Sequence, residues 1–265
     1  ITTAVSVACA VCRVNLRKFI RRGKSPRTIN SEIRIKTMKK LRKLTTLFIF
    51  CCCLFPMTMQ AQERITLQDG TVLNVFLVAP ENADGQASPL VILMGGGPGN
   101  ASISQDTSRW LGSGFAQRGW MVAVPISPNN RSFRGAINNE LIASLITQLQ
   151  KRENIAQGKV LLAGVSNGGM SALEIARRNP QDYLGVAAVP AISGADTDNE
   201  ALKDFPVYLR IGGSDQLDWA DRFDETVASL TGAGVVLNAD VLDGAPHMFR
   251  MEWESLGIWL QEIQK

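Results

Sequence analysis

Residues 160–169 read Val-Leu-Leu-Ala-Gly-Val-Ser-Asn-Gly-Gly, a short apolar run followed by a serine between glycines. The segment Gly164–Gly168 fits the pattern Gly-x-Ser-x-Gly, and it lies between a strand expected at Val160–Ala163 and a helix expected from Gly169. A serine in such a turn has strained backbone angles, and the two glycines remove side chains that would clash there. Ser166 is therefore the candidate nucleophile. The alternative is a tight glycine turn that only packs a helix on the sheet.

A second glycine-rich segment, Leu93–Gly99, follows another expected strand, where an oxyanion loop would lie. Acyl transfer builds negative charge that needs two preorganised donors, and the backbone N–H groups of Asn167 and Gly96 are the candidates. Met94 stands where such loops usually carry histidine, and it is also a candidate for the substrate pocket. A flexible turn is one alternative. A phosphate loop is another, but neither Gly-Lys-Ser/Thr nor Gly-x-Gly-x-x-Gly spacing is present.

His247 is the only histidine of the chain, and it lies after the last expected strand and before the last expected helix. A serine nucleophile needs an imidazole base on a loop at that place. The acid should follow the seventh expected strand, Val207–Ile211, where Asp215 and Asp218 both occur. Asp215 is preferred because it directly follows two glycines at the strand end, whereas Asp218 suits the N-cap of a helix. Trp219, just beyond it, is a further candidate for the substrate pocket.

Strand-like and helix-like segments alternate along the chain, which predicts an α/β fold with a mostly parallel sheet of about eight strands and helices on both faces. The expected strands are Arg64–Leu67, Val72–Val78, Leu90–Met94, Met121–Pro125, Val160–Ala163, Gly185–Val189, Val207–Ile211 and Val236–Val241. The expected helices are Ile137–Arg152, Gly169–Arg178, Trp219–Leu230 and Glu252–Ile263. The first two strands should form a hairpin at Asp69-Gly70. No insertion is long enough for a separate lid domain.

The first 61 residues differ in composition from the rest. They contain 13 of the 28 Lys and Arg, one of the 24 Asp and Glu, and all five cysteines. Residues 38–61 read as a signal peptide, with a basic start, an apolar run and a small residue before Gln62, so we expect an exported protein, periplasmic or secreted. An uncleaved anchor is the alternative, although the run is short for a membrane span. Residues 1–37 are unassigned and interpreted as lying upstream of the true start.

The remaining part, 62–265, is expected to be one catalytic domain. It holds 15 Lys and Arg against 23 Asp and Glu, a net charge of −8, which argues against a nucleic-acid partner. One histidine and no cysteine cannot supply the usual ligands of a zinc or di-iron site, so neither a metal nor another cofactor is expected. Oligomeric state is left open.

The motif Gly164–Met170, with the Asp and His behind it, resembles secreted α/β-hydrolase serine esterases, and in particular the polyhydroxybutyrate-depolymerase and feruloyl-esterase-like group. The resemblance covers about Leu90 to His247. It implies a triad of Ser166, Asp215 and His247 and an ester substrate cleaved through an acyl-enzyme. The chain departs from that group in two ways. The disulfides common in extracellular depolymerases are absent, and Met94 takes the place of the oxyanion-loop histidine. A small serine peptidase, an acyltransferase and a non-catalytic binding protein of the same fold are the alternatives.

Overall fold

The structure is a computed structural model that describes residues 60–80, 85–194 and 196–265. The expected signal peptide and the segment 1–37 lie outside the described residues, apart from Gln60 and Ala61 at the beginning of the first strand.

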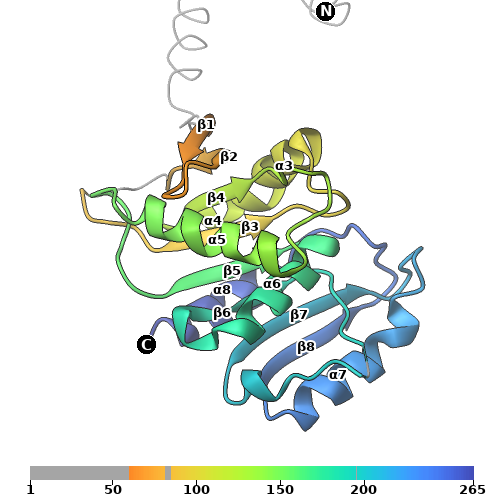
Figure 1. The fold of residues 1–265 in the computed structure, drawn as a ribbon. Helices are drawn as coiled ribbons and strands as arrows, with labels where there is room; N and C mark the ends of the chain where they lie inside the picture. The colour runs from red at the N-terminus through yellow and green to blue at the C-terminus, as the bar shows by residue number, and fades with distance from the viewer. Residues whose placement is uncertain (1–59, 81–84, 195) are drawn as a thin grey trace, which may run out of the picture. The chain divides into compact units, whose positions relative to one another are not determined.

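A single eight-stranded sheet forms the centre of the fold, in the order β1-β2-β4-β3-β5-β6-β7-β8 (Figure 1). The strands are β1 Gln60–Thr66, β2 Val72–Val78, β3 Leu90–Met94, β4 Met121–Pro125, β5 Val160–Gly164, β6 Tyr183–Ala188, β7 Pro206–Gly212 and β8 Val236–Leu242. Strand β2 is antiparallel to both β1 and β4, whereas all other neighbours are parallel. The predicted α/β fold with a mostly parallel sheet is confirmed.

The hairpin between β1 and β2 turns at the expected dipeptide. Gly70 has a φ of 86°, which a glycine adopts without steric cost. Asp69 accepts hydrogen bonds from the backbone N–H and the hydroxyl of Thr71, which lowers the pKa of its carboxyl. The turn thereby sets the register in which Thr66 pairs with Val72.

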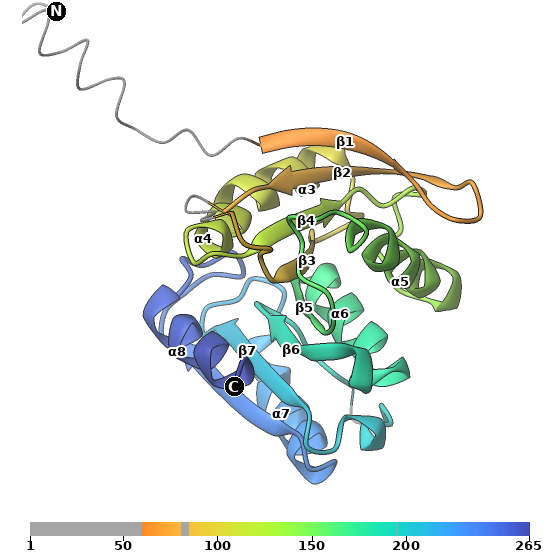
Figure 2. The same ribbon diagram turned by 90° about the vertical axis from the view of Figure 1, so that its left-hand side faces the viewer.

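Helices cover both faces of the sheet. They are α3 Ala101–Thr107, the π-helical turn η2 Ser108–Gly112, α4 Ser113–Ala116, α5 Ala136–Leu149, α6 Asn167–Arg178, α7 Phe223–Gly232 and α8 Trp253–Ile263, with short 3-10 turns η3 Pro180–Asp182, η4 Glu200–Leu202 and η5 Ala220–Arg222. Helices α5, α6 and α7 contribute to one hydrophobic core, and η2, α4 and α8 to the other. Figure 2 shows α4 and α8 on one side of the sheet and α5 and α6 on the other.

The central strands separate these two cores by simple alternation. In β3, Leu90, Ile92 and Met94 belong to the core under α5 and α6, whereas Val91 and Leu93 belong to the core under α4 and α8. All five side chains are buried, as expected for a strand covered on both faces. The carboxyl ends of β3, β5 and β7 therefore meet at one edge, where loops can carry a site.

Two helix predictions need correction. The segment from Ala101 to Ala116 is helical although no helix was expected there. The helix expected at Trp219–Leu230 begins only at Phe223, after the short turn η5. Asp218 has a φ of 57° and is exposed, so it is not the N-cap of that helix.

The buried face of α5 also differs from the one that the sequence predicts, which carries Ile137, Leu141, Leu145 and Leu149 at every fourth residue. Ile137 is 77% exposed, and Ile142 takes a place in the core beside Leu145 and Leu149. A stripe of residues at i, i+3 and i+7 follows the 3.6-residue turn better than the expected stripe at every fourth residue.

Candidate active site

Ser166 lies in the sharp turn between β5 and α6, at φ 55° and ψ −120°. Its N–H donates to the carbonyl oxygen of Pro190 at 2.8 Å, which fixes the turn against the chain that follows β6. A Cβ added at Gly164 would lie 2.2 Å from the carbonyl of Gly168, and one added at Gly168 would lie 2.1 Å from the carbonyl oxygen of Met94. Both glycines are therefore required by backbone packing. This close packing holds the strained serine in place at the carboxyl edge of the sheet.

His247 and Asp215 lie in direct contact. Nδ1 of His247 is 2.6 Å from Oδ2 of Asp215, whose side chain is fully buried. The other carboxylate oxygen accepts the N–H of Leu217 at 2.7 Å. A carboxylate at Nδ1 favours the tautomer with its proton there, which leaves Nε2 as the acceptor. The structure thus brings Asp215, and not the exposed Asp218, to the imidazole.

The two loops that carry this pair are packed on each other. A Cβ added at Gly212, the last residue of β7, would lie 2.2 Å from the carbonyl oxygen of Pro246. The backbone N–H of His247 donates to Oε1 of Gln216 at 3.2 Å. The acid loop therefore holds both the side chain and the backbone of the histidine.

The two residues named as pocket candidates lie elsewhere than expected. Met94 is fully buried in the core beneath the elbow, so its prediction as a pocket residue is wrong, because the inward alternation of β3 turns its side chain away from the edge. Trp219 does not line the cavity beside Ser166 and instead packs against the ring of His247, with centroids 4.9 Å apart and planes at 87°.

The glycine loop after β3 lies against the elbow. A Cβ added at Gly96 would be 3.3 Å from Cβ of Ser166. The side-chain amide of Asn167 donates to the carbonyl oxygen of Gly97 at 3.0 Å, which ties this loop to the beginning of α6. The backbone N–H of Asn167 belongs to the first turn of α6, where N–H groups have no partner within a helix. The two expected oxyanion donors are therefore adjacent to the serine.

A cavity of about 510 Å³ opens beside this cluster, and both Ser166 and His247 line it. No hydrogen bond joins the Ser166 hydroxyl to the His247 ring in the described part of the chain. Catalytic contacts of this kind are often long before substrate binds. The other lining residues are Gly96, Gly97, Ile103, Asp106, Thr107, Trp110, Val165, Leu217 and Met248.

Sequence reasoning missed one wall of this cavity, which Ile103, Asp106, Thr107 and Trp110 form. They lie on α3 and η2, in a segment with no clear apolar periodicity. The signal that could have found them is their position, because the segment directly follows the glycine loop and must fold back over it.

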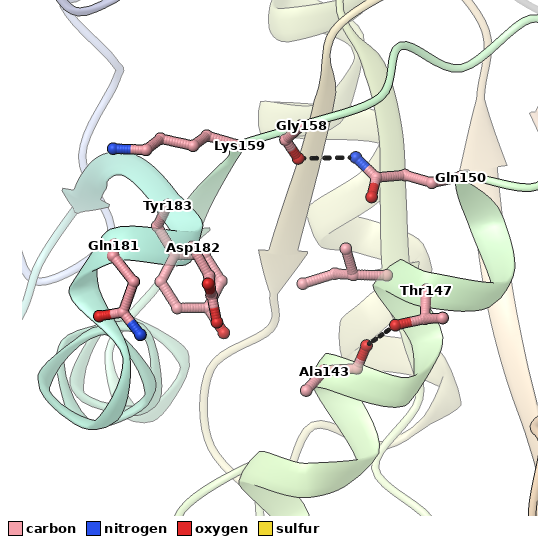
Figure 3. A pocket seen from close by; sticks show the side chains of 9 residues that line it. Ala143, Thr147, Gln150, Gly158, Lys159, Gln181, Asp182 and Tyr183 are labelled. Carbon is pink, nitrogen blue, oxygen red and sulfur yellow. Dashed lines mark hydrogen bonds between the residues drawn. The ribbon is translucent and has the colours of Figure 1, made fainter.

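A second cavity, of about 410 Å³, lies at the amino ends of β5 and β6, whereas the serine follows the carboxyl end of β5 (Figure 3). The amide of Gln150 donates to the carbonyl oxygens of Ala156 and Gly158, so its donors are already used within the fold. Burial and the neighbouring Asp182 raise the pKa of Tyr183 to about 12, which keeps the phenol protonated. The Tyr183 phenol therefore does not act as a base in this cavity.

Comparison with known structures agrees with the fold class. Dipeptidyl peptidase 4 of Porphyromonas gingivalis has a TM-score of 0.59 at 13% identity, over 78% of this chain and 35% of that one. A thermostable esterase has 0.54 at 16%, over 77% and 61%, and a ferulic acid esterase has 0.55 at 16%, over 78% and 97%. The chain thus spans about a third of the peptidase and less than two thirds of the thermostable esterase. The fold is that of the α/β-hydrolases.

The family is given by sequence. Residues 65–226 match the family described as "Putative esterase", and the chain belongs to this family. The match includes Ser166 and Asp215 and ends before β8 and His247. No curated protein matches the chain.

Two further findings concern only the residues that the structure describes. Within 60–80, 85–194 and 196–265, no group of three or more His, Cys, Asp or Glu side chains is placed to hold a metal ion. Across the same ranges, no helix is both long and apolar enough to span a membrane.

Proposed function

We propose that the chain hydrolyses carboxylic esters through a catalytic triad of Ser166, His247 and Asp215. The observation that carries the proposal is the 2.6 Å contact between Asp215 and His247 at the mouth of a cavity that Ser166 also lines. The strained elbow supports it independently, because a serine at φ 55° is costly unless the turn has a use.

The proposed reaction has two halves. Nε2 of His247 takes the proton of Ser166 as Oγ attacks the ester carbonyl carbon, and Asp215 stabilises the imidazolium. The tetrahedral intermediate then collapses, the C–O bond to the alcohol breaks, and Nε2 protonates the leaving alkoxide. Water next attacks the acyl-enzyme with Nε2 again as the base, which releases the acid and the free serine.

The oxyanion of both intermediates is assigned to the backbone N–H groups of Asn167 and Gly96. Loop and helix are tied by the amide of Asn167 on Gly97, so the donors keep their positions as charge develops. Such preorganisation accounts for a large share of catalysis, about 3 kcal/mol for one donor. The beginning of α6 adds a favourable dipole for negative charge.

Export belongs to the same proposal. The basic and apolar segment 38–61 supports it, and cleavage before Gln62 would release the esterase domain into the periplasm or medium. Expression of the full chain in a bacterial host, followed by mass analysis of the periplasmic fraction, tests this. A product that begins at Gln62 is expected, and an unprocessed cytosolic product would contradict export.

The catalytic part of the proposal is tested by hydrolysis of a panel of substrates. The panel contains p-nitrophenyl esters from acetate to decanoate and methyl ferulate. Wild-type turnover should fall to background in the variant Ser166→Ala at unchanged melting temperature. Turnover that survives this substitution would contradict the assigned nucleophile. Loss of all ester turnover in a folded wild type would contradict ester hydrolysis itself.

A further inference from the structure

One wall of the cavity that Ser166 and His247 line carries a carboxylate and an indole four residues apart. Asp106 on α3 and Trp110 on η2 both line the cavity. Asp106 is exposed, and among the described residues its carboxylate forms neither an ion pair nor a hydrogen bond, not even with the nearby cation Arg109. Trp110 is half-buried.

The π-helical turn explains how Trp110 reaches this position. A π-helical turn inserts an extra residue into a helix, changes the direction of the side chains that follow, and often occurs at functional sites. Here η2 directly follows α3, and Leu111 next to the tryptophan is buried in the core under α8. The turn therefore lets one residue face the core and its neighbour face the cavity.

Apart from Asp106, the two proposed catalytic residues Ser166 and His247, and Thr107, the cavity is lined by glycine and apolar side chains. Ile103 and Val165 contribute hydrocarbon, and the hydroxyl of Thr107 is used by a hydrogen bond to the carbonyl oxygen of Ile103 at 2.8 Å. Leu217 and Met248 are 55% and 53% exposed. Large apolar side chains so exposed beside a cavity indicate a surface that a ligand covers.

We propose that this cavity selects esters whose acyl chain is apolar and ends in a positive charge, with Asp106 and Trp110 as specificity-determining residues. The inference rests on the proposed ester hydrolysis. A carboxylate attracts an ammonium group by charge, and an indole face attracts it through the ring quadrupole. The apolar side chains cover the methylene groups between that charge and the ester carbonyl, and an anionic chain is repelled.

Three p-nitrophenyl esters of matched length test the charge preference. The first is 6-(trimethylammonio)hexanoate, the second is the neutral tert-butyl analogue 7,7-dimethyloctanoate, and the third is the anionic 6-sulfohexanoate. The attraction between exposed opposite charges and an exposed cation–π contact are both modest in water. We therefore expect kcat/KM for the cationic ester to exceed that of the neutral ester about threefold to tenfold, with the anionic ester slowest.

Salt and two matched variants assign the effect. The preference should shrink between 20 and 500 mM NaCl, since the Debye length falls from about 20 Å to about 4 Å and screening weakens the attraction between exposed charges. Asp106→Asn should remove most of the preference by lowering kcat/KM for the cationic ester more than kcat/KM for the neutral ester. Asp224→Asn removes the same charge from exposed α7 outside the cavity, and it should keep the preference. Trp110→Leu should lose part of it.

The outcomes separate this inference from the function beneath it. Turnover of the neutral ester that depends on Ser166, with equal rates for the cationic ester, would overturn only the charge selection. A cation preference that survives Asp106→Asn would overturn the role of Asp106. Absence of turnover for all three esters in the folded chain would overturn both proposals.

Discussion

Trp219 packs nearly perpendicular to the ring of His247, with centroids 4.9 Å apart and planes at 87°. His247 is thus held by three contacts: the carboxylate of Asp215 at Nδ1, the indole of Trp219 against the ring, and Oε1 of Gln216, which accepts from the backbone N–H. Trp219 itself packs against the core that covers α6 and α7. The orientation of the base therefore depends on a rigid part of the fold.

Replacing Trp219 should reduce kcat more than it raises KM. Trp219→Leu removes an aromatic pair of about 0.5–1.5 kcal/mol and frees the imidazole to rotate, so kcat should fall about threefold to tenfold. Steady-state kinetics with a p-nitrophenyl ester measures this. Trp219→Phe keeps an aromatic ring and should recover most of the rate. Equal losses in both variants would contradict a positioning role.

The choice of acid can be decided by two matched substitutions. Asp215→Asn removes the charge that holds the proton at Nδ1, and kcat should drop about 10³- to 10⁴-fold, as for the corresponding change in a Ser-His-Asp triad. Asp218→Asn changes an exposed side chain, and asparagine tolerates the backbone φ of 57° at this position. The value of kcat should therefore stay within about threefold of the wild type. The reverse order of effects would assign the acid to Asp218.

The elbow glycines give a prediction about stability. In Gly168→Ala the new methyl group would lie 2.1 Å from the carbonyl oxygen of Met94, a backbone atom that cannot move without disturbing β3. The free energy of unfolding should fall by about 3 kcal/mol, measured by urea denaturation. Gly232→Ala is the control, because nothing lies within 4 Å of its added Cβ. Similar stability in both variants would show that the elbow tolerates side chains.

Arg210 gives a second prediction about stability, this one for the loop that carries His247. Its buried guanidinium donates to Asn238 on β8 and to Ser255 on α8, the elements on either side of that loop. Arg210→Met removes three hydrogen bonds from a guanidinium to the partly buried oxygens of Asn238 and Ser255, so the free energy of unfolding should fall by about 3 kcal/mol.

The control for that change is Arg222→Met, at an exposed pair with Glu225 whose N···O distance is 4.0 Å. Exposed pairs contribute about 0–1 kcal/mol, so its stability should barely change. Thermal and urea unfolding of both variants measure the difference. A loss in the exposed variant equal to that at Arg210 would contradict the importance of burial.

Strands were readable from the sequence because buried strands of a parallel sheet are apolar runs closed by turn residues. Leu90–Met94 and Met121–Pro125 have the predicted bounds, since glycine or serine turns follow closely in the chain. The segment Ala101–Ala116 was not readable, because its helical turns alternate small and polar residues without a clear stripe. One wall of the cavity was therefore missed with it.

The pairing of side chains around the site could be anticipated only where chain order constrains it. Asp215 and His247 end adjacent parallel strands, so their loops meet at one edge of the sheet. Whether a side chain at that edge faces the cavity or the core depends on alternation at a strand end. Met94, the last residue of β3, lies in the core, whereas Gly96, two residues further on in the loop, lines the cavity.

The central claim is that Ser166 is the nucleophile, and covalent labelling tests it most directly. A p-nitrophenyl alkylphosphonate should react once per chain, release one equivalent of p-nitrophenol and abolish ester turnover. Peptide mass analysis should find the phosphonyl group on Ser166, with no labelling in Ser166→Ala. A label on another residue, or continued hydrolysis by an enzyme fully labelled at Ser166, would contradict the account.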